Sequence, residues 1–596
     1  MIRELTEEGY TIRLDLSGQV LRISTSDETD FDPATREVSF DPLFPQPSSE
    51  VLPDPLVRRP TVTPENVIHP TLRGLLDERF APVSLLVQKA KQFDDGLYAA
   101  VERAAQSGAG LFAGKASLLT DLSARLAGRP DADEPLVLLV AAARLGGLSL
   151  ELPSQLEDRV DRLTTDFLAD EQRSKPLGFY TWTDDLEAIF RQDRLLQQEI
   201  TSPRSLDALV YALRTAPPLR ATYESWLGLV SRLTNPTARQ DLRQRLAAGG
   251  SGGGSMSLCP PSVSHESELI KKLFADRPIP DGFSLVDEMI RRMRAGDLRV
   301  QPTTQSGWYD YQTWAHEPFV IPERMVEAAK LRFEEGYRNE LLDLFKGAQA
   351  LARETHIKQL ERAFAMGMDV PSLREEPLIF SVTPDLTVEP LASFYLRRAI
   401  GYGFVRRVLE GVFGPEGLGT LSRLTPDGPL PGNLGGQLEE IESLFLGAYL
   451  ITCREIALTP DESLPAEARG ERHASRFSEW AAALDSDPDL GADNRMMIPV
   501  FYDLQRRKVK VWVFLGWAAR DISVEFEMPP LAEVFDEAGQ PVVLGEDVQV
   551  AFNSEQHTVM YPVTAEVYVS RVLDRVEFRQ LCDAHTTRSA ILAQLE

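Results

Sequence analysis

A run of seven glycines and serines in the interior of the chain restricts its folding more than any other feature. The run covers residues 249–255, within the stretch RLAAGGSGGGSMSLCPPS. Glycine has no side chain and serine has only a small hydroxyl group, so such a run is typical of a flexible tether. The chain is therefore expected to fold as two parts, residues 1–248 and 256–596.

A methionine, Met256, follows the run directly. A natural linker is the alternative, but it has no need of a methionine here, whereas a second reading frame joined behind a synthetic spacer begins with one. We interpret 249–255 as an engineered Gly/Ser linker and the chain as a single-chain fusion. Because a run of this length spans at most about 25 Å, the joined ends must lie close together. Such a tether keeps two partners at roughly millimolar effective concentration, which predicts a heterodimer whose parts contact each other.

Composition and charge narrow the classes of partner. Hydrophobic residues make up 43% and charged residues 26% of the chain, as is ordinary for globular proteins. The 90 acidic residues outnumber the 63 basic residues and give a net charge of −27. A negative field repels nucleic acid and anionic membrane surfaces, so neither is expected as a partner.

The chain shows no pattern that predicts membrane insertion. Its longest apolar stretch, PLVLLVAAARLGGLSLEL at 135–152, is interrupted by Arg144 and two glycines and is too short to span a bilayer. The first residues, MIRELTEEGY, are acidic, unlike the start of a signal peptide. We expect a bacterial, soluble protein in the cytoplasm rather than a secreted one, the bacterial origin being indicated by composition alone.

Neither metal nor cofactor binding is predicted. The three cysteines form no CxxC pair, and no histidine belongs to an HExxH motif, so no metal site is expected. The stretch GAGLFAGKASLL at 108–119 departs from a phosphate-binding loop, because Ala109 and Ala116 occupy positions that require glycine and serine or threonine. We expect a glycine-rich turn between two helices there, and no cofactor.

The first part is expected to begin with strands and to continue as helices. Residues 10–25 alternate apolar and polar side chains around Ser17-Gly18, which predicts a β-hairpin. The stretch 41–64 is rich in proline and is expected to lie extended as an arm. Hairpin and arm together form a predicted segment 1–70, and helical periodicity then predicts a helical domain over 71–248.

The second part is expected to be helical over 256–490, including one long helical run from Pro322 to about Met366. Over 491–596, β-branched and aromatic runs predict a small antiparallel β-subdomain followed by a C-terminal helix. The fold class predicted for the whole chain is α+β, mainly α.

Two aromatic segments are the most distinctive candidates for a site: PLGFYTWTDDLEAIFRQDR at 176–194 and SGWYDYQTWAHEP at 306–318. Aromatic residues mixed with hydrogen-bonding groups occur at interface hot spots and ligand pockets, and also where a loop is anchored on a core. All three interpretations stay open. The candidate binding or interface residues are Tyr180, Trp182, Arg191, Trp308, Tyr309, Tyr311 and Trp314.

These segments also carry a family resemblance. Together with TVEPLASFY at 387–395 and YPVTAEVYVSRVLDRVEF at 561–578, they resemble segments of a large, mainly helical bacterial protein family of unknown function. Comparable segments lie in the same order on one continuous chain in that family. The resemblance implies a fold and no activity, and it suggests that the tether recreates a single-chain arrangement.

Three functional hypotheses follow. The first is recognition or assembly: the two parts form an intimate complex with each other, and the complex binds a protein or peptide ligand. The second is a hydrolase or peptide-modifying enzyme with its site where the two parts meet. Its acid and base groups would be Asp184, Asp185, His316 and Glu317, which must share a cleft to act on one substrate.

The third hypothesis is a carbohydrate- or peptide-binding module on the β-subdomain. The stretch KVKVWVFLGWA places Trp512 and Phe514 on the same face of a strand. If that face is exposed, its aromatic rings could bind a ligand; the alternative is a sheet covered by helices on both sides.

Overall fold

The computed structural model defines most of both parts. It describes residues 68–72, 80–129, 131–248, 254–274, 279–333, 335–361, 386–456, 458–522, 524, 557–585 and 587–595, together with the backbone of strands β1–β5 and β13–β15. Within these residues the predicted fold class, α+β and mainly α, is confirmed. The predicted proline-rich arm at 41–64 lies outside the described residues.

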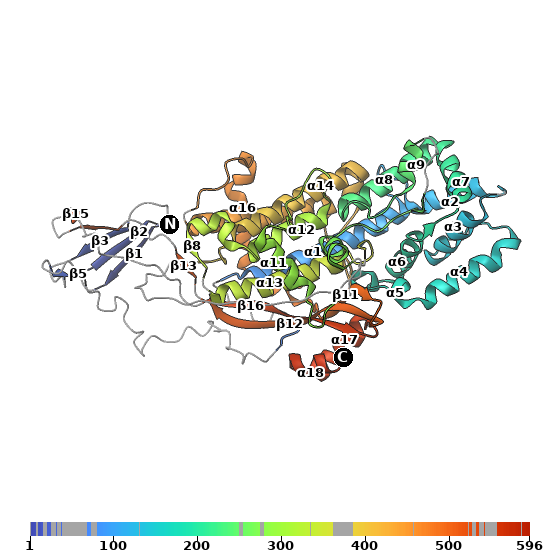
Figure 1. Ribbon diagram of the computed structural model, residues 1–596. Coiled ribbons are helices and arrows are strands. Elements are labelled where there is room, and N and C mark those ends of the chain that lie inside the picture. Colours follow the sequence, from blue (N-terminus) through green and yellow to red (C-terminus); the bar gives the residue numbers. More distant parts are fainter. Residues whose placement is uncertain are drawn as a thin grey trace.

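The first part is built around a long helix, α1 (Val83–Ser107), which is buried along almost its whole length. Figure 1 shows α1, in blue, running lengthwise between the other helices of the first part and those of the second. The remaining helices of the first part are α2 (Lys115–Leu126), α3 (Asp133–Leu145), α4 (Glu157–Ala169), α5 (Glu171–Ser174), α6 (Asp184–Leu196), α7 (Pro203–Arg214), α8 (Pro217–Leu233) and α9 (Leu242–Ala247). The helical character predicted for 71–248 is confirmed.

The glycine-rich stretch between α1 and α2 forms a turn, as predicted. Gly108, Gly110 and Gly114 all have positive φ angles, which side chains with a Cβ rarely adopt. A Cβ on Gly110 would lie 1.9 Å from the carbonyl oxygen of Phe413 in the second part. The turn therefore allows the two parts to approach each other closely. It follows a helix, α1, whereas a phosphate-binding loop follows a strand.

The second part contributes helices and a C-terminal sheet. Its helices are α10 (His265–Phe274), α11 (Leu285–Ala295), α12 (Trp308–His316), α13 (Glu335–Thr355), α14 (Ala392–Thr420), α15 (Leu434–Glu455), α16 (Glu471–Ala481), α17 (Arg575–Ala584) and α18 (Arg588–Ala593). The predicted final helix is divided in two, because Thr587 caps a new helix with its side chain.

The long helical run predicted from Pro322 to about Met366 is wrong. The chain forms two short 3₁₀ turns, η5 (Pro322–Arg324) and η6 (Val326–Ala329), and a short strand β8 (Leu331–Arg332) before α13 begins. Glu327 explains the interruption, because its buried carboxylate accepts hydrogen bonds from the backbone and hydroxyl of Ser393 near the start of α14. This tertiary contact outweighs the local preference for helix.

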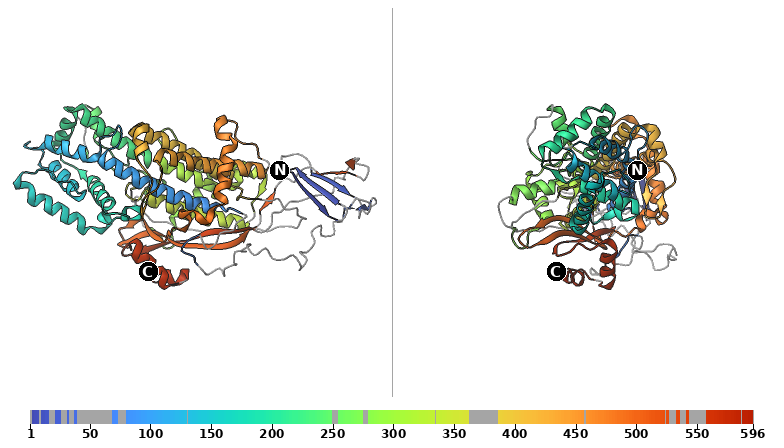
Figure 2. Two further views of the ribbon diagram at one scale, coloured as in Figure 1. Left: turned by 180° about the vertical axis from the view of Figure 1, so that it is seen from behind. Right: turned by 90° about the vertical axis from the view of Figure 1, so that its right-hand side faces the viewer.

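The predicted antiparallel β-subdomain contains a sheet with the order β11 (Met496–Asp503), β12 (Lys508–Ile522) and β16 (His557–Val569). Helix α13 contacts this sheet on one side, and Phe578 of α17 and Ile591 of α18 pack with β12 residues on the other. At a bulge in β12, the backbone of Trp517 exchanges hydrogen bonds with His69 of the first part. The first part thus also contacts this sheet, which lies along one side of the helices (Figure 2).

Short strands make up the remaining β structure. The predicted N-terminal hairpin corresponds to β2 paired antiparallel with β3. These strands belong to a five-stranded sheet with the order β1-β2-β3-β14-β15, in which β3 and β14 are parallel. The short strands are β1 (Ile2–Glu7), β2 (Tyr10–Asp15), β3 (Leu21–Thr25), β4 (Phe31–Asp32), β5 (Glu37–Val38), β6 (Glu199–Ile200), β7 (Met256–Ser257), β9 (Leu424–Thr425), β10 (Gly428–Pro429), β13 (Glu525–Phe526), β14 (Ala532–Phe535) and β15 (Pro541–Val542).

The chain enters the core immediately after the Gly/Ser run. Gly254 and Ser255 are exposed, whereas Met256, Leu258 and Cys259 are buried. Strand β7 pairs antiparallel with β6 of the first part. The second part therefore begins as a strand on the first part, and residues 249–253 of the run lie outside the described residues.

Candidate functional site

The two aromatic segments converge on one point between the parts. Phe179 lies 5.7 Å and Trp308 6.4 Å from Tyr98 of α1, measured between ring centroids. Tyr309 and Trp308 both meet the imidazole of His356 edge-on. These rings are all buried. The segments therefore join α1 to the second part within a packed core rather than around an open cleft.

The other aromatic and basic candidates lie nearer the surface. Trp182 and Tyr311 are half-buried, with Tyr311 stacked on Phe404. The Trp314 ring lies beneath the guanidinium of Arg397, and Arg191 forms an ion pair with Glu187 one helical turn away. Among the predicted candidates, Tyr180, Trp308 and Tyr309 are the ones brought into the contact between the parts.

The four predicted acid and base groups do not share a cleft. Asp184 and Asp185 are exposed in the first turn of α6, where Asp185 pairs with Arg103. Glu317 lies 2.7 Å from Arg397. His316 is buried, and burial together with the positive charge of Arg398 lowers its pKa to about 3. His316 is therefore a neutral imidazole at neutral pH.

The β-subdomain face considered for ligand binding is covered. Trp512 is 3% exposed and Phe514 is fully buried. The Trp512 indole donates a hydrogen bond to Glu566, whose carboxylate also accepts the backbone N–H groups of Leu285 and Val286 at the start of α11. These aromatic side chains belong to the core.

The most unusual feature of the interior is a set of buried charges that spans the two parts. We name the first group the two-lysine cluster: Glu102, Lys115 and Asp193 of the first part with Lys358 of the second. The Lys358 ammonium lies 2.6 Å from both Glu102 Oε1 and Asp193 Oδ2. Lys115 lies 2.6 Å from Asp193 and 3.7 Å from Glu102. Two cations and two anions thus alternate within ion-pair distance.

Aromatic groups enclose the two-lysine cluster. The Tyr180 hydroxyl donates a hydrogen bond to Glu102, and the Lys358 ammonium lies 5.1 Å from the centre of the Tyr180 ring. Although burial disfavours the ionised carboxyl group, Lys115 and Lys358 hold the pKa of Asp193 below its ordinary value. The same carboxylates overcome burial to raise the pKa of Lys358. The charged state of this cluster is therefore stabilised from both parts.

A second group, which we name the one-lysine cluster, contains Lys91 and Asp95 of α1 with Glu354 and Thr355 of α13. The Lys91 ammonium lies 2.7 Å from Asp95 and contacts Glu354 directly. Thr355 donates a hydrogen bond of 2.6 Å to Asp95. Burial and the nearby Glu354 carboxylate raise the pKa of Asp95 to about 6, against the attraction of Lys91.

Gly178 of the first aromatic segment makes room for Glu354. Its φ is +64°, and a Cβ at this position would lie 2.1 Å from Glu354 Oε1. Arg575 of α17 is 3.7 Å from the same oxygen. The glycine in PLGFYTW thus lets a carboxylate of the second part reach the first part's backbone.

A third contact between the parts centres on Asp94 of α1. Its carboxylate accepts hydrogen bonds from Arg398, Tyr402 and Gln312. The Gln312 side chain is also hydrogen-bonded to the imidazole of His356. Burial, and to a smaller extent neighbouring positive charges, lower the pKa of His356 to about 3. A continuous polar network therefore links α1 to α12, α13 and α14.

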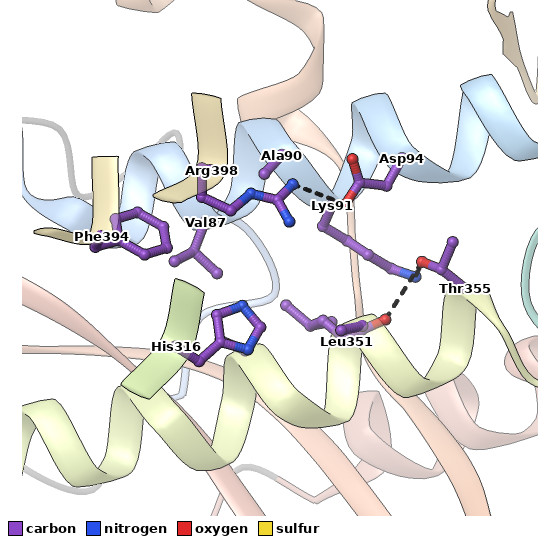
Figure 3. A pocket seen from close by; sticks show the side chains of 11 residues that line it. Val87, Ala90, Lys91, Asp94, His316, Leu351, Thr355, Phe394 and Arg398 are labelled. Carbon is purple, nitrogen blue, oxygen red and sulfur yellow. Dashed lines mark hydrogen bonds and ion pairs between the residues drawn. The ribbon is translucent and has the colours of Figure 1, made fainter. Parts of the chain in front are cut away.

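A small cavity adjoins this network and is too small for a substrate. It measures about 20 Å³, room for about one water molecule. Figure 3 shows Lys91 and Asp94 reaching it from α1, Arg398 from α14, and His316 from the opposite side. Its lining residues are Val87, Ala90, Lys91, Asp94, His316, Ala348, Leu351, Ala352, Thr355, Phe394 and Arg398.

A larger cleft, of about 300 Å³, also lies between the parts, at the molecular surface. The first part contributes residues 169–172, Lys175 and Leu177 to it. The second part contributes Pro499 and Val509 of the sheet and residues 570–572. A group that binds in this cleft contacts both parts at once.

Sequence reasoning did not identify the clustered charges. A signal was present in α1, where Lys91, Asp95, Tyr98 and Glu102 follow one another at intervals of four, three and four residues. This spacing places them on one face. Lys115 lies at the end of the glycine-rich stretch, for which the sequence predicted a turn and no buried charge.

Comparison with known proteins adds no assignment. No protein-family model, curated protein or solved structure matches the chain significantly. In the part of the chain that the structure describes, no three histidine, cysteine or acidic side chains are grouped as metal ligands. The described helices include none that is long and apolar enough to cross a membrane.

Proposed function

We propose that the chain is a two-part recognition and assembly protein. Residues 1–248 and 256–596 act as the halves of an obligate complex, held together here by an engineered Gly/Ser linker. The complex in turn binds a protein or peptide ligand. The observation that supports this proposal best is the reciprocal neutralisation of buried charges by the two parts.

In the two-lysine cluster, the second part supplies the charge that the first part lacks. Glu102 and Asp193 both belong to the first part, which offers Lys115 as a buried partner for them; Lys358 supplies the second ammonium. Removing one partner of a buried ion pair typically costs about 3–5 kcal/mol, because the other charge stays desolvated. If the first part kept this conformation without the second part, Glu102 and Asp193 would lack Lys358, and the first part would be destabilised by about this amount.

The dependence also runs in the other direction. Lys91 of the first part contacts Glu354 of the second, and Asp94 of the first part pairs with Arg398 of the second. Buried carboxylates and guanidinium groups are rarely left without a partner. Each part therefore completes the core of the other, as in obligate complexes rather than in transient ones.

The other two hypotheses have less support. A hydrolase built on Asp184, Asp185, His316 and Glu317 would need these groups in one cleft, whereas they lie on separate surfaces or within the core. A ligand site on the sheet would need Trp512 to be accessible. The 300 Å³ cleft at the junction is the better ligand candidate, because it exists only when both parts are assembled.

The direct test is to replace residues 249–255 by a protease recognition sequence and to cleave it after purification. We expect the two fragments to co-elute in size-exclusion chromatography at micromolar concentration. Met256 is buried on β6, so the cut must lie before Ser255. Two fragments that separate as folded monomers would contradict the proposal. Uncleaved protein carried through the same column is the control.

A further inference from the structure

A groove lies between helices α14, α15 and α16, away from the junction of the two parts. Ser443 of α15 and His473 of α16 meet in it, and Arg472 lines it beside them. We propose that Ser443 and His473 form a nucleophile and general-base pair for acyl transfer, with Arg472 attracting an anionic ester substrate. This activity is independent of the proposed assembly function.

The hydrogen bonds of His473 fix which ring nitrogen carries the proton. Nε2 lies 2.9 Å from the carbonyl oxygen of Glu467, and a carbonyl oxygen only accepts. Arg472 Nε also directs its N–H group at Nε2, at 3.4 Å, but the carbonyl oxygen is nearer and cannot donate. In the neutral imidazole, Nε2 therefore bears the hydrogen and Nδ1 has the free lone pair. Nδ1 lies 2.8 Å from Ser443 Oγ, so the serine hydroxyl donates to it. A serine nucleophile needs this polarity from its base.

Helix packing holds the base rigidly. His473 is 5% exposed, and a Cβ on Gly447 of α15 would lie 2.1 Å from the backbone oxygen of His473. The two helices are therefore in close contact where the pair forms. The Glu467 carbonyl orients the imidazole, as a carboxylate does in a catalytic triad.

The serine is open to the groove. Ser443 is half-buried, and the groove has a volume of about 780 Å³, which is within the range of small-molecule sites. A serine inside a helix commonly donates its hydroxyl to the carbonyl four residues earlier. Ser443 instead donates to a histidine, which raises its nucleophilicity.

The groove is lined by four glutamates, Glu439, Glu440, Glu442 and Glu467, and by three arginines. Arg406 pairs with Glu442, and Arg476 pairs with Glu440. Arg472 forms no ion pair with any described acidic residue, and it is exposed. It is thus the cation left to attract a substrate carboxylate next to Ser443, or to stabilise the oxyanion of a tetrahedral intermediate.

The reaction is ester hydrolysis in two steps. Ser443 Oγ attacks the ester carbonyl carbon while its proton passes to His473 Nδ1; the C–O bond to the alcohol then breaks, and the alcohol leaves with that proton. A water molecule gives a proton to Nδ1 and attacks the acyl-serine. The acid is released, and the proton returns to Ser443. No electrons are exchanged with an outside group.

The experiment is labelling of the full chain with a fluorophosphonate, which phosphonylates an activated serine and expels fluoride, followed by peptide mass spectrometry. We expect the Ser443 peptide to be labelled and Ser443→Ala to abolish that label. His473→Gln should slow the labelling at least about 100-fold, the usual contribution of a general base. Ser475→Ala is the matched control, because Ser475 is an exposed serine on α16 bonded only to a backbone carbonyl.

Substrate charge gives a second readout. Arg472→Ala should lower the hydrolysis of p-nitrophenyl hemisuccinate more than that of uncharged p-nitrophenyl acetate, by about tenfold. If Ser443 of the unmodified chain is labelled no faster than Ser475, the proposal is overturned. This outcome does not depend on whether the His473 variant folds. Labelling without a preference for the anionic ester would overturn the role of Arg472.

Discussion

The two-lysine cluster and the one-lysine cluster differ by a single ammonium group. Asp193 and Asp95 are both fully buried, and each lies within 2.7 Å of a lysine. Two lysines hold the pKa of Asp193 below its ordinary value, whereas burial raises that of Asp95 to about 6. The same residue type in equally buried surroundings thus has its pKa shifted in opposite directions.

The difference teaches that charge balance, rather than burial alone, decides the state of these carboxylates. In the two-lysine cluster, each acid has its own cation. In the one-lysine cluster, Asp95 and Glu354 share Lys91, and the next cation, Arg575, reaches only Glu354, at 3.7 Å, without a hydrogen bond. Buried charges stabilise a fold only when every one is compensated.

Removing the second ammonium should have the largest effect. Lys358→Met converts the balanced cluster into two carboxylates that share Lys115, and we expect the free energy of unfolding to fall by about 3–5 kcal/mol. Urea denaturation measures this loss. Lys346→Met is the matched control: its ion pairs lie at the surface, and we expect it to cost less than about 1 kcal/mol. Equal losses in the two variants would refute the comparison.

Neutralising one acid in each cluster should have unequal effects. Asp193→Asn leaves two ammonium groups with one carboxylate, so we expect a loss of about 3 kcal/mol or more. Asp95→Asn leaves one ammonium with one carboxylate, and its amide oxygen can still accept from Lys91 and Thr355. We expect a loss below about 1 kcal/mol. A greater loss for Asp95→Asn in thermal or urea unfolding would show that the one-lysine cluster is the better compensated.

Acidification should stabilise the chain through Asp95. Its folded pKa of about 6 exceeds the ordinary 3.8, so between these values the native state binds a proton that the unfolded state has lost. This stability is complete below the lower value and is lost as the pH rises through 6. From pH 7 to pH 5 we expect Asp95 to contribute about 1 kcal/mol.

Two further carboxyl groups act in the same direction, since burial raises the pKa values of Glu340 and Glu389 to about 7. The buried histidines His316 and His356 act in the opposite direction, because their pKa values are lowered to about 3 and the unfolded chain binds protons there that the folded chain does not. The pH dependence of the unmodified chain alone therefore does not give the Asp95 contribution. The measurement is urea denaturation of the unmodified chain and of Asp95→Asn at pH 5, 6 and 7. The free energy of unfolding is plotted against pH, and the difference between the two slopes gives the Asp95 contribution. Parallel slopes would mean that Asp95 takes up no proton in the folded state between pH 7 and pH 5, which would contradict a raised pKa.

The smallest effect is expected at the surface. Asp185 pairs with Arg103 at 2.7 Å, a distance similar to those in the two clusters, but both side chains are nearly half exposed. We expect Asp185→Asn to change the free energy of unfolding by less than about 0.5 kcal/mol. A loss of several kcal/mol would show that distance matters more than burial for these ion pairs.

Much of the fold could be predicted from local patterns. The hairpin at 10–25, the helices of 71–248 and the C-terminal sheet each follow from side-chain periodicity, which acts over a few residues. Predictions failed where a distant residue decides the structure. Glu327 ends a helical run because it bonds Ser393, a contact that no local pattern contains.

The candidate site shows the same limit more strongly. The aromatic segments could be located by composition, but not the partners that bring them together. Lys91 and Glu354 are separated by 263 positions, and Lys115 and Asp193 by 78. Lys358 lies in a turn just after α13, where a lysine is compatible with a surface position, and only the packed structure identifies it as buried. The polar face of α1 was the one local signal of an interior charge network.

The buried length of α1 has a consequence for synthesis of the chain. Gln88 of α1 bonds the backbone of Asp489, which is made 401 residues later. At a ribosomal rate of about 5–20 residues per second, roughly 20–80 s pass between the synthesis of Gln88 and that of Asp489. During this time the face of α1 that packs against residues 489–494 is uncovered. Production of the folded chain should therefore depend on chaperones that shield nascent helices, more than its final stability would suggest.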